Sequence, residues 1–177
     1  MTTIVMAVRW LCASLSVAAC ATPRMQAADS GTVVMVVTAD SAPVVRLARG
    51  ACHGTCPIYS VQLGANGTVR FDGTRFVRHV GLDSASVSRS TVQSLQRAFA
   101  ARNFAGVSPV IEYGTLSCGS SYVADLPTNE LTLRTSGGLH HVRWDEGCRS
   151  HPPMLDSLAQ MVDSVSRTSR WTSIQRP

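Results

Sequence analysis

The sequence predicts an α+β domain: an antiparallel sheet, made of a meander and a hairpin, with two helices packed on one face. Three observations predict this architecture. Apolar and polar residues alternate in several short segments, Asn-Gly and Asp-Gly turn signals separate some of them, and two later segments have the apolar periodicity of helices. The order along the chain favours a sheet built from sequence neighbours.

The first strands are predicted from alternation and turn chemistry. They cover residues 44–47, 57–63, 68–71 and 75–80. Asn66-Gly67 is a strong hairpin signal, because both residues tolerate the left-handed backbone of a tight turn. Asp72-Gly73 predicts a second turn of the same kind. The last three strands are therefore expected to form the antiparallel meander.

The next segments predict a helix, a hairpin and a second helix. Val92, Leu95 and Phe99 fall on one face of a helix over residues 89–102. Hydroxyl side chains that can cap its start precede it: Ser84, Ser86 and Ser88. A second hairpin is predicted over residues 130–135 and 139–144. The last helix begins at Pro152-Pro153, and its apolar stripe is Leu155, Leu158, Val162 and Val165.

The N-terminus predicts export. Arg9 precedes a short apolar run, residues 10–19, and then Cys20. This arrangement is typical of a secretory signal, and the run has about half the length of a membrane-spanning helix. Val17-Ala18-Ala19-Cys20 resembles a bacterial lipobox, which implies that Cys20 is lipidated and begins the mature protein. The alternative is an ordinary signal peptide that leaves a soluble periplasmic protein.

Four parts follow from this interpretation of the N-terminus. They are a lipoprotein signal peptide (1–19), a tether with a possible first strand over residues 32–38 (20–43), a single α+β domain (44–172) and a tail (173–177). The expected location is the bacterial cell envelope, with the lipid anchor on the periplasmic or outer-membrane side.

Export also limits the partners. The net charge of +5 comes from 16 arginines without any lysine. A basic balance can indicate nucleic acid as a partner, but an exported protein does not meet it. The expected partners are the membrane, through the lipid anchor, and an envelope protein or small ligand. We predict no cofactor.

Four cysteines remain after Cys12 is lost with the signal and Cys20 is lipidated. They are Cys52, Cys56, Cys118 and Cys148. An even number in an oxidising compartment predicts two disulfides. Three pairings are possible, and we predict that the first two cysteines pair within one loop and the last two pair with each other.

Copper or thiol chemistry is the alternative for the first cysteine pair. Cys52, His53, Cys56 and Pro57 have the CxxxCP spacing of Sco-type copper chaperones, with His53 as a possible third ligand. A reactive thiol pair usually lies at a helix N-terminus or near cations, whereas a strand pattern follows here. A four-cysteine zinc site would need a second close pair, which the spacing does not supply.

Other residue types that carry chemistry do not form a recognisable centre. His140 and His141 are neighbours in a strand, so they should point to opposite faces. His151 precedes a helix, where a loop or capping role is expected. Carboxylates that could form an acid–base pair fall in predicted turns and hairpin ends: Asp125, Glu130, Asp145 and Glu146. We therefore expect a non-catalytic binding or structural domain; a hydrolase with a divergent site is the third hypothesis.

The motif from Cys52 to Tyr59 resembles the opening of a family of bacterial domains, domain of unknown function 6438. The family's usual opening is Cys-Phe-Gly-x-Cys-Pro-x-Tyr, and His53 stands here in the place of the Phe. Other matching segments are Asn66–Val69, Gly73–Val77, Asp125–Thr128, Gly147-Cys148, the helix with Leu155 and Leu158, and Arg170-Trp171. The resemblance covers residues 44–172. It implies a secreted or lipoprotein context, and it implies no activity.

Overall fold

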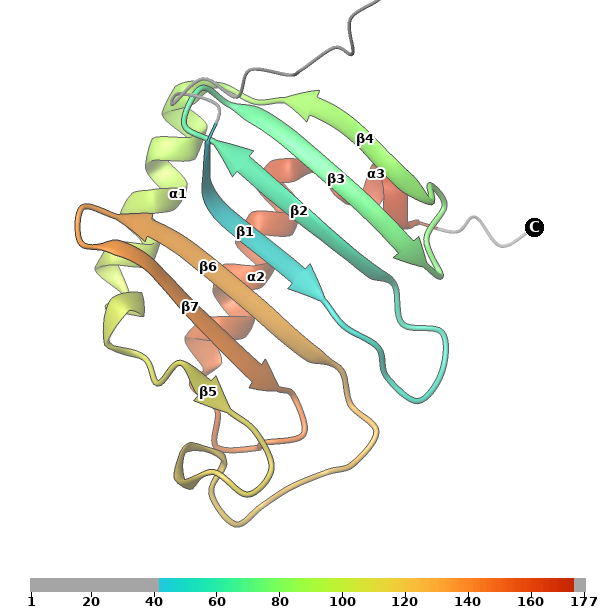
Figure 1. The fold of residues 1–177 in the computed structure, drawn as a ribbon, viewed down its shortest axis with the longest axis vertical. Coiled ribbons are helices and arrows are strands. Elements are labelled where there is room, and N and C mark those ends of the chain that lie inside the picture. Colours follow the sequence, from blue (N-terminus) through green and yellow to red (C-terminus); the bar gives the residue numbers. More distant parts are fainter. Residues whose placement is uncertain (1–41, 174–177) are drawn as a thin grey trace, which may run out of the picture. The chain divides into compact units, whose positions relative to one another are not determined.

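Seven strands form one sheet in the order β4-β3-β2-β1-β6-β7-β5 (Figure 1). The computed structural model describes residues 42–173, so Cys20, the signal peptide and the possible strand over residues 32–38 lie outside the described residues. The elements are β1 (Pro43–Arg49), β2 (Ile58–Gly64), β3 (Thr68–Arg75), β4 (Gly81–Ser86), α1 (Arg89–Ala101), η2 (Phe104–Gly106), β5 (Val110–Ile111), η3 (Leu116–Cys118), β6 (Thr128–Thr135), β7 (Gly138–Asp145), α2 (Pro153–Ser166) and α3 (Ser169–Thr172).

The α+β class is confirmed, but the sheet is mixed rather than purely antiparallel. The short strand β5 pairs in parallel with β7, through Val110 and Ile111 opposite Arg143 and Trp144. The sequence did not predict β5, because a two-residue strand has no periodicity. Its pairing buries Ile111 to 1 % exposure and covers part of the edge of β7.

Strand β1 joins the meander and the hairpin into one sheet. It pairs with β2 on one side and β6 on the other, both antiparallel. Val45 and Leu47 on this central strand are almost completely buried. The predicted hairpin is present as β6 and β7. The sheet is continuous because β1 and β6, which lie about 85 residues apart in the chain, pair with each other.

The predicted turn at Asp72-Gly73 was wrong, and so was the strand over residues 75–80. Both residues lie inside β3, where Gly73 pairs with Tyr59 of β2 and with Gly81 of β4. Pairing on both sides outweighs the local turn preference of the dipeptide. A Cβ atom at Gly73 would lie 2.1 Å from the carbonyl oxygen of His79, so the residue is selected here by a close approach of backbone.

The start of α1 follows from this shift. Ser84 and Ser86 belong to β4, so the prediction that they cap the helix was wrong. Ser88 is the N-cap, and its hydroxyl accepts a hydrogen bond of 3.1 Å from the backbone N–H of Thr91. The helix then begins at Arg89, as predicted.

The hydrophobic core is built from residues of the strands and of the two long helices. Figure 1 shows α2 crossing behind the sheet, and α1 contacts α2. The largest buried side chains include Phe71, Phe99, Phe104, Trp144, Leu47, Leu63, Leu95, Leu155 and Leu158. On the other side of the strands, alternate positions carry polar residues that are partly or fully exposed, as expected for an antiparallel sheet with one wet face.

The first and last residues of β1 lie at opposite ends of the sheet. The strand starts at Pro43 and ends at Arg49, which is about 20 Å further along. Arg49 pairs with Asn129 at the start of β6, and Asn129 pairs with Trp144 near the end of β7. We call this the Arg49 end of the sheet. Within residues 42–173, no helix has the length and hydrophobicity needed to span a bilayer.

Candidate functional site

A row of side chains with polar groups crosses the sheet at the Arg49 end. Tyr59, Arg49, Asn129 and Trp144 lie side by side on β2, β1, β6 and β7. We call these four residues the polar row. The neighbouring rows further into the sheet are apolar, with Val61, Leu47, Leu131 and Val142 in the next one, each fully buried. Tyr59 and Trp144 are themselves core residues, so the polar row forms the edge of the core at this end of the sheet.

One side of α2 supplies carboxylates to this row. Asp156 and Asp163 are seven residues apart, so they lie on the same side of the helix two turns from each other. Asp163 accepts hydrogen bonds from Arg49 Nη2 (2.7 Å), the Tyr59 hydroxyl (2.7 Å) and the Thr168 hydroxyl (3.0 Å). Both oxygens of Asp163 are thus occupied.

These contacts hold Arg49 and Tyr59 in fixed protonation states. Burial by itself would lower the pKa of Arg49, but the adjacent Asp163 carboxylate outweighs this effect and raises the pKa. Burial raises the pKa of the Tyr59 hydroxyl, and the Asp163 carboxylate raises it further. Arg49 is therefore a cation and Tyr59 a neutral donor throughout the physiological range.

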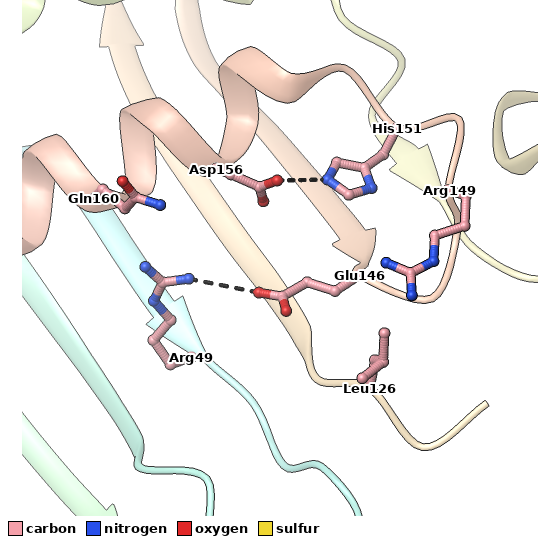
Figure 2. A pocket seen from close by; sticks show the side chains of 7 residues that line it. All are labelled: Arg49, Leu126, Glu146, Arg149, His151, Asp156 and Gln160. Carbon is pink, nitrogen blue, oxygen red and sulfur yellow. Dashed lines mark hydrogen bonds and ion pairs between the residues drawn. The ribbon is translucent and has the colours of Figure 1, made fainter. Parts of the chain in front are cut away.

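A cavity of about 280 Å³ lies beside the polar row. Its lining residues come from the end of β1, from the loop before β6, from the loop between β7 and α2, and from α2 itself: Arg49, Leu126, Glu146, Arg149, His151, Asp156 and Gln160 (Figure 2). Glu146 Oε1 accepts a 2.6 Å hydrogen bond from Asn129 Nδ2 and lies 3.8 Å from Arg49 Nη1. Asn129 is fully buried, and its Oδ1 has no partner among the described residues.

The imidazole of His151 is held between two acceptors. Nδ1 lies 2.6 Å from the Cys148 carbonyl oxygen, and Nε2 lies 2.8 Å from Asp156 Oδ2. A carbonyl and a carboxylate can only accept, so each ring nitrogen must carry a hydrogen and the ring is an imidazolium. Burial lowers the pKa of His151, but the hydrogen bonds to Asp156 and Cys148 outweigh burial and raise it. The raised pKa favours the cationic form of this histidine, in which both ring nitrogens are engaged as donors.

Arg149 differs from the other charged residues of the cavity. Its backbone N–H donates to the Ser121 carbonyl oxygen at 3.1 Å. Within residues 42–173, no carboxylate lies at ion-pair distance from its guanidinium, and the residue is exposed. Figure 2 shows this guanidinium at the side of the cavity opposite Arg49. It is available to an anionic group from outside the domain.

The disulfides are the two pairs that the sequence predicts. Cys118 and Cys148 are joined with a Cα–Cα distance of 4.8 Å, and both are fully buried. This bond ties the last residue of η3 to the chain immediately before Arg149 and His151, so it helps to fix the rim of the cavity. Loop closure of this length contributes nearly 4 kcal/mol in the chain-entropy estimate.

The second disulfide joins Cys52 to Cys56, with a Cα–Cα distance of 5.8 Å. In this state the sulfurs are bonded to each other and are not thiolates, so copper or thiol chemistry would first require reduction. His53 is exposed, and its backbone N–H donates to the Asp125 carbonyl oxygen. Within residues 42–173, no group of three metal-ligating side chains is assembled.

The other residues singled out from the sequence lie apart. His140 packs edge-on against Phe104 in the core, whereas His141 faces the other side and contacts Thr132. The two histidines thus point to opposite faces, as predicted. Glu130 forms an ion pair with Arg46 at 3.3 Å on the exposed side of the sheet.

The four candidate carboxylates do not form an acid–base pair. Asp145 accepts from the Tyr122 hydroxyl at 3.0 Å and from the backbone of Gly147 at 2.7 Å. Asp125 lies in a turn with a positive φ of 69°. Of the four, only Glu146 lines the cavity.

Sequence reasoning missed most of the cavity. His151 was expected in a loop or capping role, but it lines the cavity. Arg149, Asp156 and Gln160 were not singled out at all. The spacing of Asp156, Gln160 and Asp163 at i, i+4 and i+7 was a usable signal, because it places three polar residues on one side of the helix.

Comparison with known proteins gives a family and no activity. The family described as Domain of unknown function (DUF6438) matches residues 43–166. This match starts at the first residue of β1 and ends at the last residue of α2. No curated protein matches the chain. The match includes every residue that lines the cavity, and this chain belongs to the DUF6438 family.

Proposed function

We propose that the protein is a lipid-anchored component of the bacterial cell envelope whose DUF6438 domain binds a small ligand without catalysis. In this proposal Cys20 carries the lipid and the segment before Pro43 is the tether. Helices α1 and α2 form one layer on the face of the sheet that bears the polar row. The lipobox-like sequence Val17–Cys20 supports the anchor, since two or more acyl chains hold a protein stably at a bilayer.

The cavity beside Arg149 is the observation that carries the binding function. Groups with catalytic potential around it are already committed: His151 to Asp156 and the Cys148 carbonyl, and Tyr59 to Asp163. A general base needs a proton-accepting nitrogen or oxygen within reach of a substrate. Arg149 has no ion-pair partner in the described domain, whereas its charged neighbours in the cavity do. This arrangement favours binding of a ligand over catalysis.

The position of the cavity agrees with a tethered receptor. The chain enters the domain at Pro43, at the opposite end of β1 from Arg49. The cavity and the first residue of β1 therefore lie at opposite ends of that strand.

Metabolic labelling with a fatty-acid analogue tests the anchor. The wild-type chain and Cys12→Ser should take up label, and Cys20→Ser should take up none. Cys12→Ser is the matched control, since it also removes an N-terminal thiol. Label retained by Cys20→Ser, or absent from the wild type, would contradict lipidation at Cys20.

Binding is tested separately with the full-length chain purified in detergent. Ligand-observed NMR is run on separate mixtures of small anions, cations, zwitterions and neutral sugars. The proposal predicts that at least one class binds and that Leu126→Trp, which fills the cavity, abolishes that binding. If no class binds, or if binding survives cavity filling, the domain does not use this cavity for small ligands.

A further inference from the structure

We infer that the cavity binds a small zwitterion, a molecule that carries both a carboxylate and an ammonium group. This inference rests on the proposed binding function and names the class of ligand. The ligand class follows from the charged groups around the cavity that keep unused capacity within the described residues, namely Arg149 and Glu146.

Most of the charge around the cavity is paired internally. Arg49 donates to Asp163 at 2.7 Å, and His151 donates to Asp156 at 2.8 Å. Within the described residues, two charged groups keep unused capacity. The guanidinium of Arg149 has no ion-pair partner there, and Glu146 uses Oε1 for its contacts and leaves Oε2 without one.

These two groups have opposite charge and line the same cavity. Figure 2 shows the Arg149 guanidinium and the Glu146 side chain extending beside the same space, and no ion pair of 4.0 Å or less joins them. A ligand with only an anionic group would meet the carboxylates of Glu146 and Asp156. A ligand with only a cationic group would meet Arg149 and the His151 imidazolium. A zwitterion satisfies both sides at once.

The local geometry supports each half of the ligand. The planar fork of an arginine suits two parallel hydrogen bonds to a carboxylate. On the other side, fully buried Asn129 holds the Glu146 carboxylate through Nδ2, and the amide's Oδ1 has no partner among the described residues. Asn129 does not line the cavity, so its contribution is to hold the Glu146 carboxylate in place.

The volume limits the size of the ligand. A cavity of about 280 Å³ lies at the small end of the range for ligand sites, which runs from about 300 to 1,000 Å³. The lining has a single aliphatic side chain, Leu126. The ligand is therefore of amino-acid size and has little apolar surface.

The test uses a series of probes on the full-length chain in detergent at constant ionic strength. Glycine, β-alanine and γ-aminobutyrate carry the same two charges at increasing separation. Sodium acetate and methylammonium chloride carry one charge each, and glucose carries none. The signals followed in ¹H–¹⁵N spectra are the Arg149 Nε–H and the Gln160 side-chain amide, both at the cavity.

At least one zwitterion should shift both signals saturably, whereas acetate and methylammonium should shift them at least tenfold more weakly at equal concentration. Arg149→Gln should lower the affinity for that zwitterion by about tenfold or more, the loss of one charge-assisted contact. Glu146→Gln should lower it as well, while its amide can still accept from Asn129. Arg97→Gln, an exposed arginine of α1 that does not line the cavity, should change nothing.

Other outcomes separate this inference from the proposed function. Acetate binding as tightly as the zwitterions would make the cavity an anion site, and glucose binding alone would make it a sugar site. Each would overturn the zwitterion and leave the binding function in place. If no probe shifts either signal, the inference is wrong, and the proposed function then depends on the broader ligand screen.

Discussion

Replacing Asp163 by asparagine tests the polar row most directly. The carboxylate accepts from three donors on three elements of the fold: Arg49, Tyr59 and Thr168. The substitution keeps the size of the side chain and one acceptor but removes the charge. Arg49, with 19 % of its side chain exposed, would lose its close counterion and keep only the 3.8 Å contact with Glu146.

The size of the effect follows from that geometry. Removing one partner of a buried ion pair costs about 3 to 5 kcal/mol, and the residual exposure of Arg49 places this case near the lower limit, at about 3 kcal/mol. For a domain of this length, that loss lowers the melting temperature by about 10 °C. Tyr59→Phe is the matched control, since it removes one hydrogen bond to the same carboxylate and should cost about 1.5 kcal/mol, the lower limit for a hydrogen bond to a charged group.

Urea denaturation followed by circular dichroism gives the free energy of unfolding for each variant. The single variant Arg49→Met and the double variant Arg49→Met with Asp163→Asn complete a double-mutant cycle. The double variant should lose less free energy of unfolding than the two single variants lose together, because no charge is left buried alone. The reasoning would be refuted if Asp163→Asn cost no more than Tyr59→Phe, or if the two losses at Arg49 and Asp163 simply added.

Three further predictions concern the disulfide, a histidine and a glycine. Replacing Cys118 and Cys148 together by serine should lower the free energy of unfolding by about 4 kcal/mol in denaturant titrations; a loss under about 1 kcal/mol would show that the bond does not constrain the unfolded chain. Because the pKa of His151 is raised in the folded state, the contribution of its protonated ring to the free energy of unfolding is complete below the pKa in the unfolded chain, about 6.5. That contribution is lost as pH rises through the pKa in the folded state. The difference in free energy of unfolding between wild type and His151→Gln should therefore shrink from pH 6 to pH 9, and it should stay under about 1 kcal/mol. A difference that grows with pH would contradict an imidazolium at this position. Gly67→Ala should be destabilising by more than about 1 kcal/mol in the same titration, because Gly67 has φ of 92° and a Cβ there would lie 2.1 Å from the Val87 carbonyl oxygen; an unchanged midpoint would show that the turn can shift.

The sequence predicted elements well where local chemistry decides them. Val92, Leu95 and Phe99 define the buried face of α1, and Ser88 caps it, because helix period and capping involve residues a few positions apart. The Asn66-Gly67 turn likewise connects β2 and β3. The same kind of signal failed at Asp72-Gly73, since strands on both sides of β3 pair with these residues.

The candidate site was much less predictable than the elements. Glu146 was noted as a carboxylate and His151 as a loop residue, but neither had a partner in the sequence pattern. Arg49 and Asp163 are separated by 114 residues, and their 2.7 Å contact exists only because α2 crosses the end of β1. Nothing local to Arg49 distinguishes it from the chain's other arginines.

The sequence by itself determined the family and the α+β class. These depend on composition, periodicity and short spacings, which neighbouring residues carry along the chain. Only the tertiary structure decided which polar side chains meet. Strand register aligned Tyr59, Arg49, Asn129 and Trp144. The packing of α2 then decided which of them contact a carboxylate of that helix. That Arg149 has no ion-pair partner within residues 42–173 is visible only in the folded domain, because the distance between two charges is set by the tertiary structure.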